Sequence, residues 1–202
     1  MKKYQQTLLL LVCLLAFSPN TIVMAQNSTL PYAEIPDAPK KYNACTVAAR
    51  MVDGLGFRYY WATEGLRSED LNYKPSESAR NVEATLDHIY GLTMVVLNSV
   101  KGLPNVRPMT DMPTTYEEKR RRTLLALKEA SDILRNSKPR KMNDFKVVFQ
   151  RGDTKTEYPF WNQLNGPIAD AIWHAGQVVS FRRASGNPLN PKVSVFAGKL
   201  RN

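Results

Sequence analysis

The sequence is poor in cysteine, with two in 202 residues. Cys13 falls in an apolar N-terminal segment, so Cys45 is the one cysteine in the rest of the chain and no disulfide can form within that part. The fold must therefore depend on packing, with or without a bound metal. Cys45 stands near a predicted helix start among alanine and valine, where a small core residue is more common than the alternative, a reactive nucleophile.

Long apolar runs are also missing. The run Leu8–Phe17 is too short to span a bilayer, so we expect no stable membrane insertion. Two lysines precede it and Val23–Ala25 follows it, as in a signal peptide cleaved before Gln26. We therefore predict a signal peptide over residues 1–25 and export to a periplasm or out of the cell; a retained or lipid-attached N-terminus is the alternative.

Acidic residues are fewer than basic ones, with 18 Asp and Glu against 28 Lys and Arg. The formal net charge is +10, and +8 remains once Lys2 and Lys3 are removed with the signal peptide. Basic residues gather at Lys119–Arg122, Lys138–Lys141 and Arg182-Arg183, but no aromatic residues are interleaved with them, and an exported protein seldom meets nucleic acid. We therefore expect no nucleic-acid partner. We expect solvated helix faces, or weak attraction to anionic lipid or glycan.

Apolar residues recur at three- and four-residue steps over most of the chain, which predicts amphipathic helices. The first three cover residues 42–63, 76–101 (capped by Ser76 or Ser78) and 114–136 (capped by Thr114 in a capping box with Glu117). Residues 103–113, with three prolines, form a long crossing loop. The segment 144–161 alternates polar and apolar residues around Arg151-Gly152-Asp153, which predicts a short β-hairpin or an extended excursion.

A fourth helix is predicted within Leu164–Pro188. Asn165 and Gly166 can cap its start, Pro167 suits its first turn, and Gly186-Asn187-Pro188 is a stop signal. The predicted fold is thus all-α: a four-helix bundle over residues 42–187, with a long crossover and a short β-hairpin insertion before the last helix. An extended lead-in (26–41) precedes it and a C-terminal tail (188–202) follows.

The chain has only two histidines, and each lies in the middle of a predicted helix. Asp170 and His174 are four residues apart and share one face of the last helix, which we expect to be otherwise buried. His88 lies on the second helix, and a bundle can bring the three together as metal ligands with open positions for water or substrate. The alternative is that the histidines are hydrogen-bonded core residues and that Asp170 pairs with Arg182 or Arg183.

Two segments, NVEATLDHIYGL around His88 and DAIWHAGQ around His174, resemble the DinB-like superfamily of four-helix-bundle proteins. The connector WATEGLRSEDLNYKPSESARNVEATLDHI is also similar, and the resemblance spans about residues 42–188. In that family a second-helix histidine and a His-x-x-x-His pair commonly bind a divalent metal. The resemblance therefore implies His88 and His174 as ligands, with Asp170 where the family usually has histidine. Aspartate can ligate Zn, Ni, Mn or Fe.

Two further residues are candidates for the surroundings of this site. Gln177, one turn beyond His174, would orient a ligand or hold a metal-bound water, or else form a structural hydrogen bond. Tyr60, with its aromatic neighbours, would line a ligand pocket, although core packing is the more frequent role of such a cluster.

The function predicted from these residues is that of an exported, DinB-like, divalent-metal-binding protein. Family members with known activity resemble thiol-dependent transferases or isomerases. Because low-molecular-weight thiols are mainly cytosolic, export favours a hydrolase or metal-dependent binding of a small molecule. The alternative is a metal-free binding or structural protein that keeps a relic of the site. Catalytic residues, substrate and homodimer formation stay open.

Overall fold

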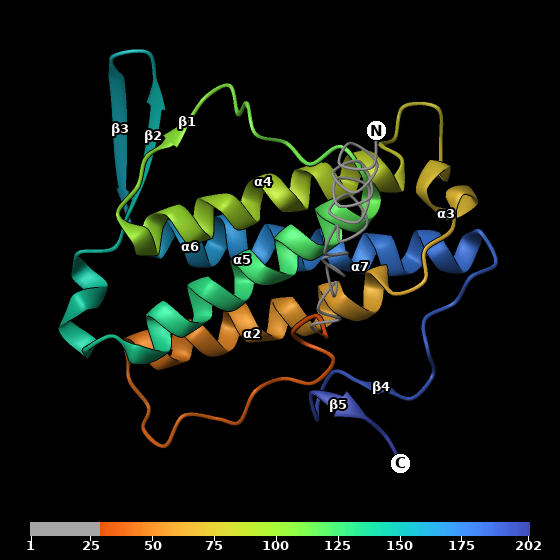
Figure 1. The fold of residues 1–202 in the computed structure, drawn as a ribbon, viewed down its shortest axis with the longest axis horizontal. Coiled ribbons are helices and arrows are strands. Elements are labelled where there is room, and N and C mark those ends of the chain that lie inside the picture. Colours follow the sequence, from red (N-terminus) through yellow and green to blue (C-terminus); the bar gives the residue numbers. More distant parts are fainter. Residues whose placement is uncertain (1–28) are drawn as a thin grey trace, which may run out of the picture.

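The computed structural model describes residues 29–202, so the predicted signal peptide lies outside the described residues. This part of the chain is mostly helical with a small sheet (Figure 1). Its body consists of four long helices: α2 (Ala44–Thr63), α4 (Val82–Lys101), α5 (Tyr116–Asn136) and α7 (Ala169–Ala184). Among residues 29–202, no helix combines the length and the apolar character needed to cross a membrane.

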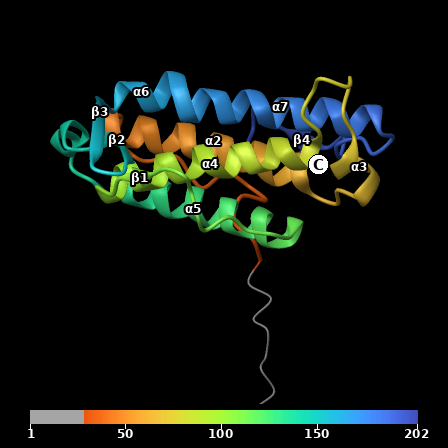
Figure 2. The ribbon, with the colours of Figure 1, turned by 90° about the horizontal axis from the view of Figure 1, so that it is seen from above.

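The four long helices lie side by side, as Figure 2 shows from above. Each helix packs against two others, in the pairs α2–α5, α5–α4, α4–α7 and α7–α2. Helices α2 and α5 are antiparallel, because Tyr116 at the start of α5 donates to the carbonyl of Thr63 at the end of α2. Farther along α5, Ser131 lies 3.4 Å from the carbonyl of Ala49, near the start of α2.

Helices α4 and α5 run in the same direction. Lys119 pairs with Asp87 in the first half of both helices, and Lys101 pairs with Glu129 farther along. Two consecutive helices can be parallel only if the chain returns to the starting end between them. Residues 102–115 make that return, which explains the long connection.

The core lies between these helices and is made of side chains at three- and four-residue spacing. Alanines and a cysteine on α2 and α7 allow close packing, and leucines and isoleucine from α4 and α5 fill the space between them. Fully buried members include Cys45, Ala49, Leu55, Leu86, Ile89, Leu124, Leu127, Ala171 and Val178. Each buried leucine or isoleucine contributes about 1.5–3 kcal/mol relative to an exposed one.

The start of α4 differs from the expectation. Its cap is Asn81, whose side chain accepts a hydrogen bond from the backbone N–H of Ala84 (2.9 Å), so the assignment of Ser76 or Ser78 was wrong. Asn81 directly precedes the helical run, whereas the serines lie in a turn before it. The connector between α2 and α4 also contains a short helix, α3 (Ser68–Asn72), which the sequence analysis did not predict.

Helix α5 is capped by Thr115, one residue later than expected. The Thr115 side chain accepts from the N–H of Glu118 (3.2 Å). Thr114 and Glu117 have the same three-residue spacing as Thr115 and Glu118, so the spacing alone could not choose between the two pairs.

A three-stranded sheet stands at one end of the helices (Figure 1). Strands β2 (Lys146–Arg151) and β3 (Thr154–Pro159) are antiparallel, and they occupy the segment for which a hairpin was expected. Strand β1 (Asn105–Val106) pairs in parallel with β2, so part of the expected crossing loop is a strand. The short 3-10 helix η1 (Pro139–Asn143) links α5 to this sheet.

The last helical region begins earlier than expected. Helix α6 (Trp161–Gln163) continues through a π-helical turn, η2 (Leu164–Ile168), into α7, so a start at Asn165–Pro167 was wrong. Gly166 has non-helical dihedrals (φ −96°, ψ −111°), and Pro167 has no N–H to donate. The same residues that suit a helix start therefore form a kink here. The stop is confirmed, because Gly186 has a positive φ of 81° at the end of α7.

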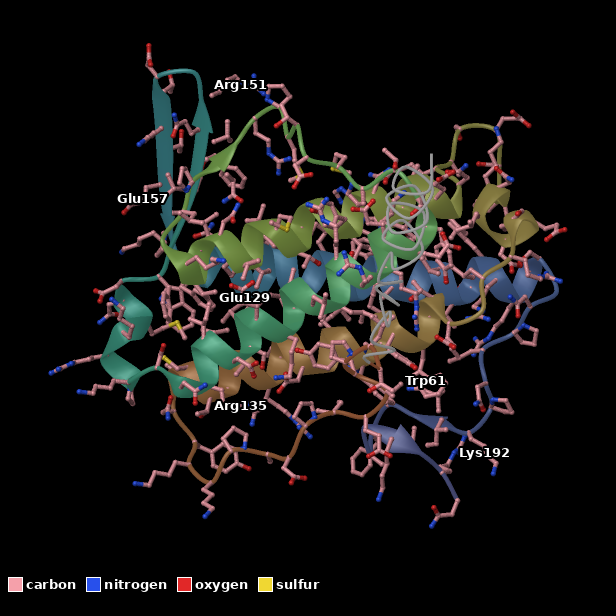
Figure 3. The ribbon with its side chains drawn as sticks, viewed as in Figure 1. Trp61, Glu129, Arg135, Arg151, Glu157 and Lys192 are labelled. Carbon is pink, nitrogen blue, oxygen red and sulfur yellow. The ribbon has the colours of Figure 1, made fainter. Side chains whose placement is uncertain are left out.

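The lead-in and the tail are both docked on the helices. Trp61, labelled near the end of α2 in Figure 3, donates its indole N–H to the carbonyl of Ala33 (3.1 Å). In the tail, strands β4 (Val193–Ser194) and β5 (Lys199–Leu200) form a small hairpin, and the carbonyl of Gly198 accepts from the N–H of Ile35 (2.8 Å). The ends of the described chain are thus tied to each other and to α2.

Candidate metal centre

His88 of α4 meets Asp170 and His174 of α7, as the sequence predicted. One ligand atom from each residue lies within 4.8 Å of the other two. Nε2 of His88 is 3.2 Å from Oδ2 of Asp170, and Nε2 of His174 is 3.3 Å from Oδ1. Ligands about 2.1 Å from one ion, at tetrahedral or octahedral angles, are about 3.0–3.4 Å apart. The two His–Asp separations fall in that range; they end on different oxygens of the carboxylate and fit hydrogen bonds equally well.

The fold positions these ligands through the α4–α7 contact. Asp170 lies in the first turn of α7, directly after the π-helical kink, and His174 is one turn farther on. Before the kink, the buried side chain of Gln163 donates to the carbonyl of Val95 on α4 (2.9 Å). This hydrogen bond fixes the segment before the kink against α4. The kink at Gly166 then sets the direction in which α7 runs from there toward His88.

Gln177 orients His174. The amide oxygen Oε1 of Gln177 lies 2.6 Å from Nδ1 of His174. With this oxygen as acceptor, the proton of a neutral His174 is on Nδ1, and Nε2 directs its lone pair toward Asp170. A hydrogen bond to the nitrogen that does not face the site is the usual arrangement for a metal-binding histidine.

The cluster lies at the protein surface, and the expected burial of this face was wrong. The side chains of His88, Asp170 and His174 are 35%, 36% and 14% exposed. The fully buried stripe of α7 contains Ala171 and Ala175, each one residue after a ligand and so about 100° around the helix. The ligands therefore line the edge of the α4–α7 contact, where solvent or a small molecule can reach them.

The expected alternative partner of Asp170 is engaged elsewhere. Arg182 is buried and donates to the carbonyls of Trp61 and Ala62 at the end of α2, each at 3.1 Å. Burial lowers the pKa of its guanidinium. Arg183 is exposed. Asp170 pairs with the two histidines, so an Asp170–Arg182 salt bridge does not form.

Only Arg121 of the basic run in α5 is exposed, and the other three cations have acidic partners. Lys119 is only 2% exposed and pairs with Asp87 of α4 at 2.5 Å. Arg122 pairs with Asp111 of the crossing loop and lies over the ring of Tyr90, 5.3 Å from its centroid. Lys119 and Arg122 thus hold α5 against its neighbours, so neither is available to bind an anion at the surface.

Tyr60 is not brought to the metal ligands. Its ring packs under the guanidinium of Arg120, 4.6 Å from the ring centroid, and edge-on to Trp61. Cys45 is fully buried, its thiol lies 3.5 Å from the carbonyl of Lys138, and burial raises its pKa, so its position is that of a core residue.

One aromatic side chain beside the ligands was missed. Trp173 directly precedes His174 on α7 and is 70% exposed. Helical geometry places it on the flank of the Asp170 face, about 60° from Asp170. Exposed indoles commonly line sites for apolar ligands. The same spacing argument that grouped Asp170 with His174 could have identified it.

Comparison with known proteins gives no relative: no family model, no curated protein and no solved structure matches this chain.

Proposed function

We propose that the protein is an exported, DinB-like four-helix-bundle protein that binds a divalent metal through His88, Asp170 and His174. We further propose that it uses the metal as a transferase or hydrolase acting on a small molecule. The packing of α2, α4, α5 and α7 in a ring, with a crossover between the parallel α4 and α5 and a hairpin before α6, supports the bundle.

The observation that carries the metal proposal is the convergence of three possible ligands from two helices. Nε2 of His88 lies 3.2 Å from one carboxylate oxygen of Asp170, and Nε2 of His174 lies 3.3 Å from the other. One ligand atom from each residue lies within 4.8 Å of the other two, and a single divalent ion could bridge atoms at this spacing.

The donor set fits a transition metal. Imidazole ligands suit Zn, Ni and Fe, a carboxylate also suits Mn, and the one carboxylate lowers the net charge of the bound ion. When bound, the ion would act as a Lewis acid at its remaining coordination positions. The residues of the chain have separate tasks: Gln177 holds the His174 ring, Asp170 carries the balancing charge, and the partial exposure of all three ligands admits a substrate.

The competing function is a metal-free binding or structural protein. It is favoured by the position of Asp170, since each carboxylate oxygen already lies within 3.3 Å of one imidazole. In that case Asp170 would fasten α7 to α4 through the histidines, and no ion would be needed.

A metal-linked melting experiment separates the two functions. A ligand that binds only the folded state, at 100 times its Kd, stabilises it by about 2.7 kcal/mol. For a chain of this size that is a rise of about 5–10 °C in Tm. We expect Zn, Ni or Mn to raise the Tm of the untagged protein and Asp170→Ala to abolish the rise. Asp153→Ala, in the exposed hairpin turn, is the matched control and should keep it. An unchanged Tm in wild type, or an equal rise in Asp170→Ala, would contradict the proposal.

A further inference from the structure

A cavity of about 750 Å³ lies at the end of the helices opposite α3. It is bounded by the first turns of α2, by η1, by the base of the β2–β3 hairpin and by α6, which meet at the left of Figure 1. Its wall is largely apolar: it includes Val47, Met51, Met142, Phe160, Trp161 and Leu164. Pockets of this volume and lining are typical of sites that bind small apolar ligands.

The mouth of this cavity exposes large apolar side chains. Trp161 is 76% exposed, and Val47 and Met51 are about half-exposed. A second hollow of about 380 Å³ shares Val47 and Met51 with the first and extends the groove to Tyr42, which is also exposed. A contiguous apolar surface of this kind is costly in water and commonly marks a binding groove.

The groove is also positively charged. Lys146 lines the cavity itself, and none of the lining residues is acidic. Lys41 and Arg50 line the adjoining hollow. Among residues 29–202, no carboxylate lies within 4 Å of the Lys146 ammonium group. The nearby Asp144 is occupied by Lys141, at 3.1 Å.

We propose that this cavity binds a free, single-chain anionic amphiphile, of the class of the fatty acids. The alkyl chain would lie along the apolar wall, and the carboxylate would pair with Lys146. The lining calls for both parts of this ligand. A purely apolar molecule would cover the apolar wall but leave the ammonium group of Lys146 without an anionic partner. The proposal is independent of the metal, because the cavity and the ligand cluster share no residue.

The test is a calorimetric titration of the purified protein with sodium dodecanoate below its micelle concentration. Tryptophan emission is a second readout, compared between wild type and Trp161→Phe because the chain also contains Trp61 and Trp173. We expect saturable binding of one molecule per chain and a blue shift as the indole is covered. Decanoate has two fewer methylenes and should bind about 15-fold more weakly, at about 0.8 kcal/mol per methylene. Dodecyltrimethylammonium should bind at least tenfold more weakly than dodecanoate.

Two variant pairs locate the site. Val47→Trp fills the mouth and should abolish binding, whereas Leu125→Trp, at a half-exposed apolar position on α5, should not. Lys146→Glu should weaken dodecanoate about tenfold, and Lys199→Glu on β5, with the same charge change, should have no effect. Equal binding of the carboxylate and the ammonium amphiphile, or unchanged binding by Val47→Trp, would overturn the proposal. So would binding to phosphatidylglycerol vesicles without binding of free dodecanoate, since that result indicates a membrane surface.

Discussion

The hydrogen bond between Gln177 and His174 predicts how the affinity for metal responds to a substitution at Gln177. Replacing Gln177 with Leu removes the acceptor for the Nδ1 proton, so the ring can rotate and the proton can move to Nε2. Loss of such a partner typically weakens metal binding by about 10–100-fold. Competition with a chromophoric chelator would measure the change.

Gln177→Glu is the matched control, because a carboxylate can still accept the Nδ1 proton. It should retain most of the metal affinity. If Gln177→Leu binds metal as tightly as wild type, Gln177 has no part in the site.

Asp70 makes the free energy of unfolding depend on pH in the acidic range. Its carboxylate is fully buried and accepts hydrogen bonds from Arg67, from Ser185 (2.6 Å) and from Asn187 (2.6 Å), which tie α3 to the end of α7. The Arg67 side chain is the main cause of a pKa well below the usual range of an aspartate. A depressed pKa in the folded state stabilises the protein above the unfolded pKa of about 3.9, and this contribution is lost as the pH falls below that value.

We therefore expect Asp70→Asn to cost about 2–4 kcal/mol at pH 7, because buried donors lose an anionic acceptor. The difference from wild type should be the same at pH 5 and should shrink between pH 4 and pH 2. Urea unfolding at these values would test this, with Asp153→Asn as an exposed control. A difference that stays constant down to pH 2 would contradict the assignment.

At the scale of the elements, α2 contains two glycines, Gly54 and Gly56, whose replacement should have different costs. A Cβ on Gly56 would lie 2.5 Å from the ring of Tyr32, whose hydroxyl donates to the buried Asp53 (3.1 Å). A Cβ on Gly54 would meet only the flexible end of Arg58, at 3.2 Å. Gly56 thus allows the lead-in to dock against the helix, and Gly54 has no such role.

Gly56→Ala should therefore destabilise the protein by about 1–3 kcal/mol through overpacking. Gly54→Ala, two residues away in the same helix, should be neutral or stabilise it by up to about 1 kcal/mol, from helix propensity. Guanidinium unfolding of both variants is the measurement. Equal effects at the two positions would mean that Tyr32 is not packed against α2.

Hydrophobic periodicity predicted the helices well, whereas single residues such as caps, glycine and proline predicted their ends poorly. Periodicity placed α2, α4 and α5 because it reflects the burial of one face. The cap of α5 was shifted by one residue because Thr114 and Thr115 each precede a glutamate by three. The π-helical turn was missed because Gly166 and Pro167 suit a helix start as well as a kink, and only tertiary packing distinguishes these outcomes.

The same limit applies to the site. The four-residue spacing was enough to group Asp170 with His174, and the scarcity of histidine pointed to His88. Exposure of the cluster could not be predicted, because it depends on how α7 is rotated against α4. The burial of Lys119 was likewise hidden, since its partner Asp87 is on another helix.

At the scale of the whole molecule, the basic residues with identified contacts serve two purposes. Cations of α5 attach it to α2, α4 and the crossing loop, while Lys146 and its neighbours surround an apolar groove. The two proposed sites share no residue: one would use histidine and aspartate ligands and the other an apolar wall.

Export is expected to remove residues 1–25, and N-terminal sequencing of the exported protein should begin at Gln26.

The central claim is that His88, Asp170 and His174 hold a metal ion, and the bound metal itself is the most direct test. The protein would be purified without a His tag and its metal content measured by mass spectrometry, for wild type, His88→Ala and His174→Ala. We predict about one equivalent of a divalent metal in wild type and none in either variant. A wild-type protein that is purified without metal and takes up no Zn, Ni, Mn or Fe on incubation would contradict the account.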